Sequence, residues 1–176
     1  MVDMIRDKLD KAWDAHERGE NLDALKLCNE VLELDPNSYL AYSYRASVYV
    51  GLKDYYKAID DANKSIEINP TYYYSYNNRG CAYLELGNYE QALSDFSESI
   101  RRVGRRKYPI PYLNRAATYI ELKEYEKAID DCNKVIEFKP TCAEAYNNRG
   151  CAYEELGETT KAQVDFVKAK QLGYNS

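Results

Sequence analysis

Apolar residues recur along the chain with the spacing expected for one face of an α-helix. In one stretch they lie four and three residues apart, at Tyr42, Ala46 and Tyr49. Residues 51–54 interrupt this pattern, and a second apolar helical face follows them. Pro70 then ends the segment, because proline cannot continue a helix. Residues 39–72 are therefore predicted to form two helices joined by a short turn.

The same two-helix pattern occurs five times. The sequence of residues 76–83 returns unchanged at 146–153, and weaker copies begin at Tyr42 and Tyr112. An alanine marks the second helix of each unit, at Ala24, Ala58, Ala92, Ala128 and Ala162. This period predicts five units within one domain spanning residues 1–176. Their approximate bounds are 5–38, 39–72, 73–106, 109–142 and 143–176.

The third unit carries the fullest set of repeated positions: Tyr76, Gly80, Tyr83, Leu86-Gly87, Tyr89, Ala92 and Phe96. This set resembles the tetratricopeptide repeat, and the resemblance covers essentially the whole chain. It implies an all-α fold, a right-handed α-α superhelix (solenoid) of about ten antiparallel helices. It further implies that the first helices of successive units line a concave groove, in a protein-binding scaffold or adaptor rather than an enzyme.

Asparagines occupy one phase of the predicted groove, at Asn78, Asn114 and Asn148. A side-chain amide offers a donor and an acceptor, so it can hold a peptide backbone without reading its sequence. Several peptide-binding relatives use asparagine at this place, which supports that interpretation. The alternative is that these amides only cap or solvate the groove. The lysines of a carboxylate clamp are missing, since Leu9, Tyr74 and Asn78 stand in their places.

The predicted groove is also acidic and partly apolar. Seven acidic residues face it against Arg6 alone, namely Asp10, Glu17, Glu85, Glu121, Glu144, Glu154 and Glu155. Such a surface favours a neutral-to-basic ligand, mainly through faster encounter. The alternative is that these carboxylates are merely solvated. The remaining predicted peptide contacts are Asn77, Asn147, Tyr44, Tyr74, Leu84 and Leu113.

Two further sets of charged residues have different interpretations. Arginines at 45, 79, 115 and 149 share one phase, and aspartates follow each of them sixteen residues later. We expect these arginines to pair with aspartates on second helices as part of the scaffold. Five cations crowd into one short segment, at Arg101, Arg102, Arg105, Arg106 and Lys107. This patch either suits a helix C-terminus or meets an anionic partner, phosphate or membrane surface.

Composition narrows the class of protein further. The net charge is −5, with 24 basic against 29 acidic residues, which argues against binding of nucleic-acid backbones. The sequence has no apolar run of the ~18 residues that a membrane span needs, and its start does not resemble a signal peptide. Five cysteines without a C-x-x-C pair indicate a reducing, cytoplasmic setting.

The sequence offers no set of residues suited to catalysis or metal binding. One histidine cannot supply the usual histidine-containing zinc sites, and no nucleophile–base set or phosphate loop is present. We therefore expect no cofactor and no enzymatic activity. The leading hypothesis is a module that binds an extended, neutral-to-basic peptide or a helix of a partner protein in the groove. The alternative is a scaffold that associates with itself, as a homodimer, or docks through its ends or convex face.

Overall fold

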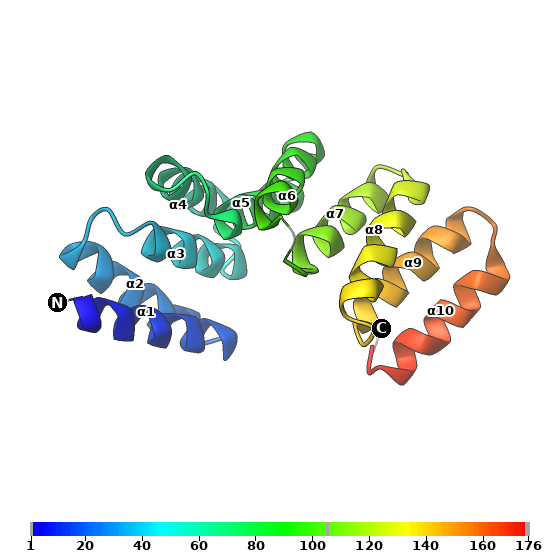
Figure 1. Cartoon of the computed structure of the whole chain (residues 1–176), viewed down its shortest axis with the longest axis horizontal. Helices are drawn as coiled ribbons and strands as arrows, with labels where there is room; N and C mark the ends of the chain where they lie inside the picture. The colour runs from blue at the N-terminus through cyan, green and yellow to red at the C-terminus, as the bar shows by residue number, and fades with distance from the viewer. Residues whose placement is uncertain (1, 105, 175–176) are drawn as a thin grey trace. The chain divides into compact units, whose positions relative to one another are not determined.

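The computed structural model describes residues 2–104 and 106–174, and within them it contains ten helices and no strand. The helices are α1 (Val2–Glu17), α2 (Asn21–Leu34), α3 (Tyr39–Gly51), α4 (Tyr55–Ile68), α5 (Tyr73–Glu85), α6 (Tyr89–Val103), α7 (Ile110–Glu121), α8 (Tyr125–Phe138), α9 (Ala143–Glu155) and α10 (Thr159–Gln171). Each predicted repeat contains one pair of these helices (Figure 1). The predicted all-α class is confirmed.

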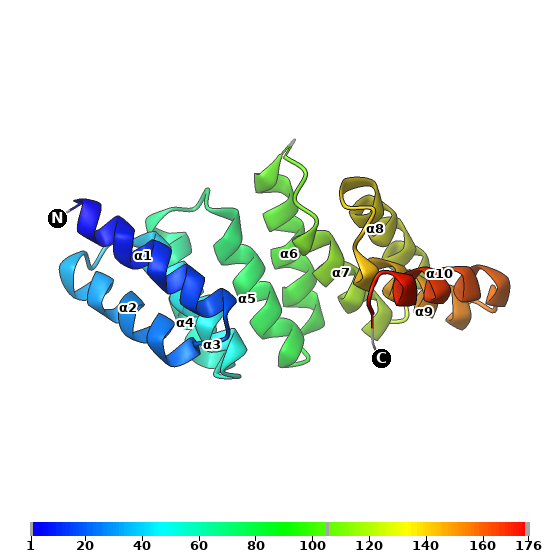
Figure 2. The same cartoon turned by 90° about the horizontal axis from the view of Figure 1, so that it is seen from below.

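The chain divides into two compact units, Met1–Arg102 and Val103–Ser176. In the first unit, α1 packs on α2 and α3 packs on α4, while α3 also contacts α1 and α5. In the second unit, α7 packs on α8, α9 packs on α10, and α8 and α7 both contact α9. Figure 2 shows the same helix pairs from a direction turned by 90°. The expectation of a single domain over residues 1–176 stays a prediction.

In two repeats, a glycine on the first helix faces a phenylalanine on the second helix where the two helices cross. A Cβ atom added to Gly80 would lie 2.7 Å from the Phe96 ring, and one added to Gly150 would lie 2.7 Å from the Phe166 ring. In the fourth repeat, Ala116 stands at the glycine place, and the smaller Cys132 shares its buried cluster. Close packing of the helix pair thus places the smallest residue opposite the phenylalanine ring and a smaller partner opposite alanine.

The turn between the two helices of each repeat uses left-handed backbone at one place. Glycine fills it in three repeats, with φ of 77° at Gly19, 73° at Gly87 and 75° at Gly157. Lysine fills it in the other two, with φ of 60° at Lys53 and 59° at Lys123. Glycine adopts this conformation without a Cβ penalty, so the two lysines are the strained members of the set.

Each arginine of the repeated phase pairs with the aspartate that follows it by sixteen residues. The Nε and Nη2 atoms of Arg45 donate to Asp61 at 2.6 and 2.7 Å, and Arg79 binds Asp95 at 2.8 and 2.7 Å. Arg115 and Arg149 repeat the arrangement in the second unit. The arginine side chains are mostly covered and the aspartates are 9% exposed or less. The structural interpretation of this set is confirmed.

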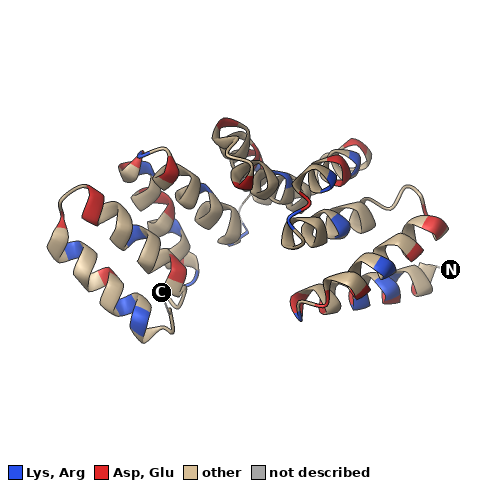
Figure 3. Cartoon of the chain, turned by 180° about the vertical axis from the view of Figure 1, so that it is seen from behind, with Lys and Arg blue, Asp and Glu red and all other residues tan. Residues whose placement is uncertain are grey.

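Charged residues of both signs are spread over the helices of both units (Figure 3). Within residues 2–104 and 106–174, no helix has the length and apolarity needed to cross a membrane. The same residues contain no cluster of three or more His, Cys, Asp or Glu side chains placed to hold a metal ion.

Candidate functional site

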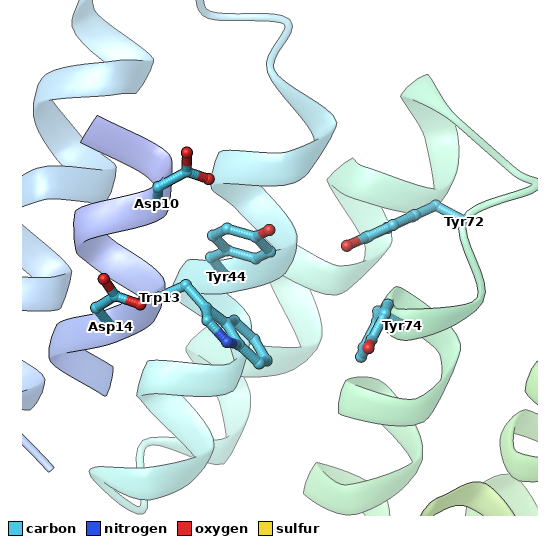
Figure 4. A pocket seen from close by; sticks show the side chains of 6 residues that line it. All are labelled: Asp10, Trp13, Asp14, Tyr44, Tyr72 and Tyr74. Atoms are coloured by element: carbon cyan, nitrogen blue, oxygen red, sulfur yellow. The ribbon is translucent and has the colours of Figure 1, made fainter. Parts of the chain in front are cut away.

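A pocket of about 350 Å³ opens on the first unit (Figure 4). We call it the aromatic pocket, and it is lined by Asp10, Trp13, Asp14, Tyr44, Tyr72 and Tyr74. These residues come from three successive repeats. Helix α1 supplies the aspartates and the tryptophan, α3 supplies Tyr44, and the start of α5 supplies the other two tyrosines. The pocket is therefore built from the first helices that the sequence predicted to line a groove.

The helical periodicity of α1 explains how its three residues reach one place. Asp10 and Asp14 are four residues apart and Trp13 lies between them, so all three project from adjacent turns toward the same side. Tyr72 is the N-cap of α5 and has extended backbone (φ −80°, ψ 100°), whereas Tyr74 lies in the first helical turn. The change from extended to helical backbone brings these two side chains to the same pocket.

The four rings contact one another in tilted and edge-on arrangements. Trp13 and Tyr44 have centroids 5.2 Å apart, Trp13 and Tyr74 are 6.2 Å apart, and Tyr72 and Tyr74 are 5.5 Å apart. These separations are in the range in which the quadrupoles of aromatic rings attract one another. The cluster continues beyond the pocket, because Tyr39 packs edge-on to Tyr72 at 5.1 Å. Mutual packing thus holds the pocket walls in place.

The hydroxyl groups of Tyr44 and Tyr72 point toward each other across the pocket (Figure 4). Burial raises the pKa of both tyrosines, and the charge of Asp10 raises the pKa of Tyr44 further. Both phenols consequently stay protonated at neutral pH and can donate hydrogen bonds. They are hydrogen-bonding groups and carry no negative charge.

The two carboxylates give the aromatic pocket its charge. Asp10 and Asp14 are exposed, and neither forms a salt bridge with any residue that the structure describes. The Arg18 guanidinium, one turn beyond Asp14, binds the Glu20 carboxylate instead, at 2.7 Å. No lysine or arginine of the described chain lines the pocket. The pocket therefore combines aromatic faces with two exposed carboxylates that form no salt bridge within the described residues.

The predicted asparagine contacts lie elsewhere on the same first helices. Asn78 is buried, and its Nδ2 donates to the carbonyl oxygen of Ser43 at 2.9 Å, which links α5 to α3. Asn77 is also buried, and its Nδ2 lies 3.8 Å from the Cys81 sulfur. Asn78 and Asn77 thus serve the packing of the first unit, and the role predicted for them in holding a peptide stays a prediction.

Three predicted asparagine contacts lie in the second unit. Asn147 lies 3.9 Å from the Cys151 sulfur through its Nδ2 atom, which repeats the contact of Asn77. Asn114 on α7 and Asn148 on α9 are half-buried. These side chains share the predicted phase, and their role in holding a peptide also stays a prediction.

The remaining predicted peptide contacts differ in exposure. Glu85 and Glu155 are exposed and accept hydrogen bonds from the hydroxyls of Tyr55 at 3.1 Å and Tyr125 at 3.0 Å. Both bonds join the second helix of one repeat to the first helix of the next, so these glutamates contribute to the scaffold. Glu121 is exposed, whereas Leu84 and Leu113 are half-buried.

The predicted cationic patch contains two arginines that pair with a glutamate and two exposed cations. Arg101 and Arg102 both donate to the Glu98 carboxylate, at 2.7 and 2.6 Å, close to the C-terminus of α6. Arg106 and Lys107 are exposed, and Arg105 lies outside the described residues. Two of the five cations therefore have a helix-terminal role, and a role of the patch in anion binding stays a prediction.

Sequence reasoning placed Asp10, Tyr44 and Tyr74 on the groove face but did not assign Tyr72 or Asp14 to it. The available signal for Tyr72 was the run of three tyrosines at 72–74, directly before a helix. An N-cap side chain leaves the helical periodicity, so its direction could not be derived from that period. Asp14 was missed because later repeats bury the equivalent place, as at Val48.

Comparisons with known proteins agree with this architecture. Three family models described as tetratricopeptide repeat match the chain, at residues 9–73, at 62–94 together with 132–164, and at 109–142. No curated protein matches the chain. Proteins of this family are generally interaction modules without enzymatic activity.

Solved structures with the same fold share little sequence with this chain. The crystal structure of MamA protein is 24% identical, with 98% of this chain and 93% of that chain covered and a TM-score of 0.75. TTC0263, a thermophilic tetratricopeptide protein of Thermus thermophilus, is 22% identical, with 96% and 91% covered and a TM-score of 0.82.

YrrB, described as a tetratricopeptide protein with an unusual peptide-binding site, is 20% identical, with 94% and 84% covered and a TM-score of 0.70. At such identities these likenesses show the fold alone. The family matches, the five helix pairs and the shared fold lead to one conclusion: the chain belongs to the tetratricopeptide repeat family.

Proposed function

We propose that this protein is a non-enzymatic adaptor that binds an extended, neutral-to-basic peptide of a partner protein across α1, α3 and α5. The observation that carries the proposal is the aromatic pocket, which is open, acidic and lined by rings that pack against one another. Aromatic side chains in a pocket are typical anchoring sites at interfaces. YrrB, which shares the fold, has a peptide-binding site by its own description.

The acidic character of the first helices supports the choice of a neutral-to-basic ligand. Asp10 and Asp14 border the pocket itself, and Glu85 is exposed near the end of α5. Exposed carboxylates speed the encounter with a cationic segment and disfavour an acidic one. Affinity on the order of micromolar would be ordinary for recognition of this kind.

Peptide display on the purified protein tests the proposal. The selection is run on the unmodified protein and on Tyr74→Ala, with Tyr56→Ala as the matched control. Tyr56 lies on α4, is 73% exposed and lines no part of the pocket. We expect enriched sequences with the unmodified protein and Tyr56→Ala, and their loss with a folded Tyr74→Ala. Enrichment that is equal on all three proteins would contradict the proposal.

The asparagines predicted to hold a peptide in the second unit have their own test. Asn114 and Asn148 hold the predicted phase on α7 and α9, where half-buried amides could meet a peptide backbone. For a selected peptide, we expect the double substitution Asn114→Ala with Asn148→Ala to weaken binding several-fold. Unchanged affinity would confine the ligand to the first unit.

Self-association is the second candidate, and a different surface favours it. Val164 and Val167 on α10 are 64% and 57% exposed, and they border a cavity of about 600 Å³ between α9 and α10. Exposed aliphatic side chains on one face of a helix are suited to burial against a second copy. Sedimentation of the unmodified protein and of Val164→Lys with Val167→Lys tests this candidate. A mass of one chain for both proteins would exclude it.

A further inference from the structure

The residues of the aromatic pocket favour a particular class of side chain rather than peptides in general. Four aromatic rings form its walls, and the carboxylates of Asp10 and Asp14 lie at its edge. The face of an aromatic ring attracts a cation through its quadrupole, and a nearby carboxylate adds hydrogen-bond acceptors and charge. No lysine or arginine of the described chain lines the pocket, so the cation would come from the ligand.

The protein itself shows how these groups hold an arginine. The Arg45 guanidinium lies 5.5 Å from the centroid of the Tyr42 ring while it donates two hydrogen bonds to Asp61. Arg149 lies 5.5 Å from the centroid of the Tyr146 ring and binds Asp165 in the same way. A tyrosine face and a carboxylate are thus the recurrent partners of a guanidinium in this fold. The aromatic pocket offers the same two partners without the cation.

Three cationic groups could enter such a pocket, and its features favour one of them. A lysine ammonium is strongly hydrated, so it loses more solvation when it lies against aromatic rings. A trimethylated ammonium suits the rings but has no N–H, so it would make no hydrogen bond to Asp10 or Asp14. A guanidinium is planar, weakly hydrated and rich in donors, so it can stack on a ring and bind a carboxylate together.

We propose that the aromatic pocket binds an arginine side chain of the ligand. The guanidinium stacks on the rings of Trp13 and the tyrosines, and it donates hydrogen bonds to Asp10 and Asp14. This inference deepens the proposed function, since it names the side chain by which the peptide is anchored. The pocket lies entirely within the first unit, so the proposal needs no particular placement of the second.

The single tryptophan of the chain makes the pocket directly observable. Trp13 is the one tryptophan among 176 residues, so the indole N–H signal in an NMR spectrum reports on this pocket alone. We would titrate the protein with Nα-acetyl-arginine amide and with the citrulline, lysine and trimethyllysine counterparts. Citrulline has nearly the shape of arginine and no charge. We expect a saturable shift with arginine, with a dissociation constant about tenfold lower than for the other three compounds.

Substitution of the two carboxylates distinguishes their contribution to binding from that of the overall negative charge of the protein. Asp10→Asn with Asp14→Asn should weaken arginine binding about tenfold, because the hydrogen-bonded ion pair is lost. The matched control is Asp60→Asn with Asp130→Asn, which removes the same charge from exposed places on α4 and α8. We expect the control to bind arginine as the unmodified protein does. Equal weakening in both variants would overturn the proposal.

The remaining outcomes distinguish this inference from the proposed function. Equal shifts with citrulline and arginine would overturn the arginine assignment, as would tighter binding of lysine or trimethyllysine. Display-selected peptides that bind without shifting the Trp13 signal would also overturn it, while peptide binding itself would stand. A specific Trp13 response to arginine in a protein that selects no peptide would support the pocket and count against the proposed peptide function.

Discussion

The two units share a scaffold but differ in what their first helices present. Both contain the Arg–Asp pair, the Gly–Phe crossing and the Tyr–Glu bond between adjacent repeats. At the place of Trp13, however, the second unit has Ala117 and Cys151, and at the place of Tyr44 it has Asn114 and Asn148. The aromatic pocket therefore has no counterpart built from the same positions.

This difference separates packing from recognition. Residues that join the helices of a repeat are kept in both units, because each helix pair must bury the same kind of surface. Residues on the open side of the first helices are free of that constraint and vary between units. A functional site in a repeat protein is therefore best sought where equivalent positions differ.

The largest effect is expected from Gly80→Ala and Gly150→Ala, which test the scaffold that the two units share. Each added methyl group would meet a phenylalanine ring at 2.7 Å, so we expect each change to destabilise its own unit by about 2 kcal/mol or more. Urea unfolding followed by Trp13 fluorescence reports on the first unit, and circular dichroism reports on both. The comparison predicts that Gly80→Ala shifts the fluorescence transition more than Gly150→Ala does.

A second substitution checks that a clash is the cause. Phe96→Cys introduced into Gly80→Ala recreates the alanine–cysteine pair of the fourth repeat, at Ala116 and Cys132. We expect this change to recover part of the lost stability. If Phe96→Cys makes the Gly80→Ala protein less stable still, the two side chains are not matched in size as we infer.

The next effect distinguishes the asparagines of the two units. Asn78→Ala removes the bond to the Ser43 carbonyl and leaves that buried acceptor without it, so we expect a loss of about 1–2 kcal/mol in the unfolding free energy. Asn148→Ala, at the equivalent half-buried place, should cost less than half as much. Equal losses of unfolding free energy, measured by urea unfolding, would show that the two amides contribute equally to stability.

A smaller effect, of opposite sign, is expected at the strained turns. Lys53→Gly in the first unit and Lys123→Gly in the second should each raise the unfolding free energy by roughly 0.5–1 kcal/mol, because φ near 60° carries a Cβ penalty. The exposed Lys57→Gly, inside α4, is the opposite control and should destabilise by about 1 kcal/mol. Destabilisation by Lys53→Gly would mean that the lysine side chain outweighs the backbone strain.

The smallest effect is a pH dependence confined to the end of α6. Hydrogen bonds from Arg101 and Arg102 lower the pKa of Glu98 from 4.5 to about 2. Because the folded-state pKa is depressed, the stabilisation is complete above pH 4.5 and is lost as the pH falls toward 2. Glu98→Gln removes this dependence, and since Arg101 is mostly exposed the effect should be roughly 0.5 kcal/mol.

The Glu98 prediction is measured as a difference between proteins. On acidification from pH 6 to pH 3, the unmodified protein should lose more unfolding free energy than Glu98→Gln does. Glu90→Gln, an exposed substitution on the same helix, serves as the control for general acid effects. An equal loss of unfolding free energy in all three proteins would show that Glu98 does not cause the pH dependence.

The sequence by itself determined the repeats, their helix pairs and the pairing of arginine with aspartate. These features follow from a period of about 34 residues, because equivalent residues in a repeat must occupy equivalent surroundings. Gly80 and Phe96 were also repeated positions in the sequence, but only the structure showed that they meet where the two helices cross. Periodicity was sufficient for contacts that recur at equivalent positions from repeat to repeat, such as the Arg–Asp pairs.

Only the tertiary structure decided which groove residues are available to a ligand. Asn78 and Asn114 have the same phase in the sequence, yet Asn78 is buried against Ser43 and Asn114 is half-buried. Tyr72 reaches the aromatic pocket from an N-cap, where the helical period does not apply. The physical reason is that periodicity gives the direction of a side chain from its own helix, whereas exposure depends on the side chains that neighbouring helices bring to it.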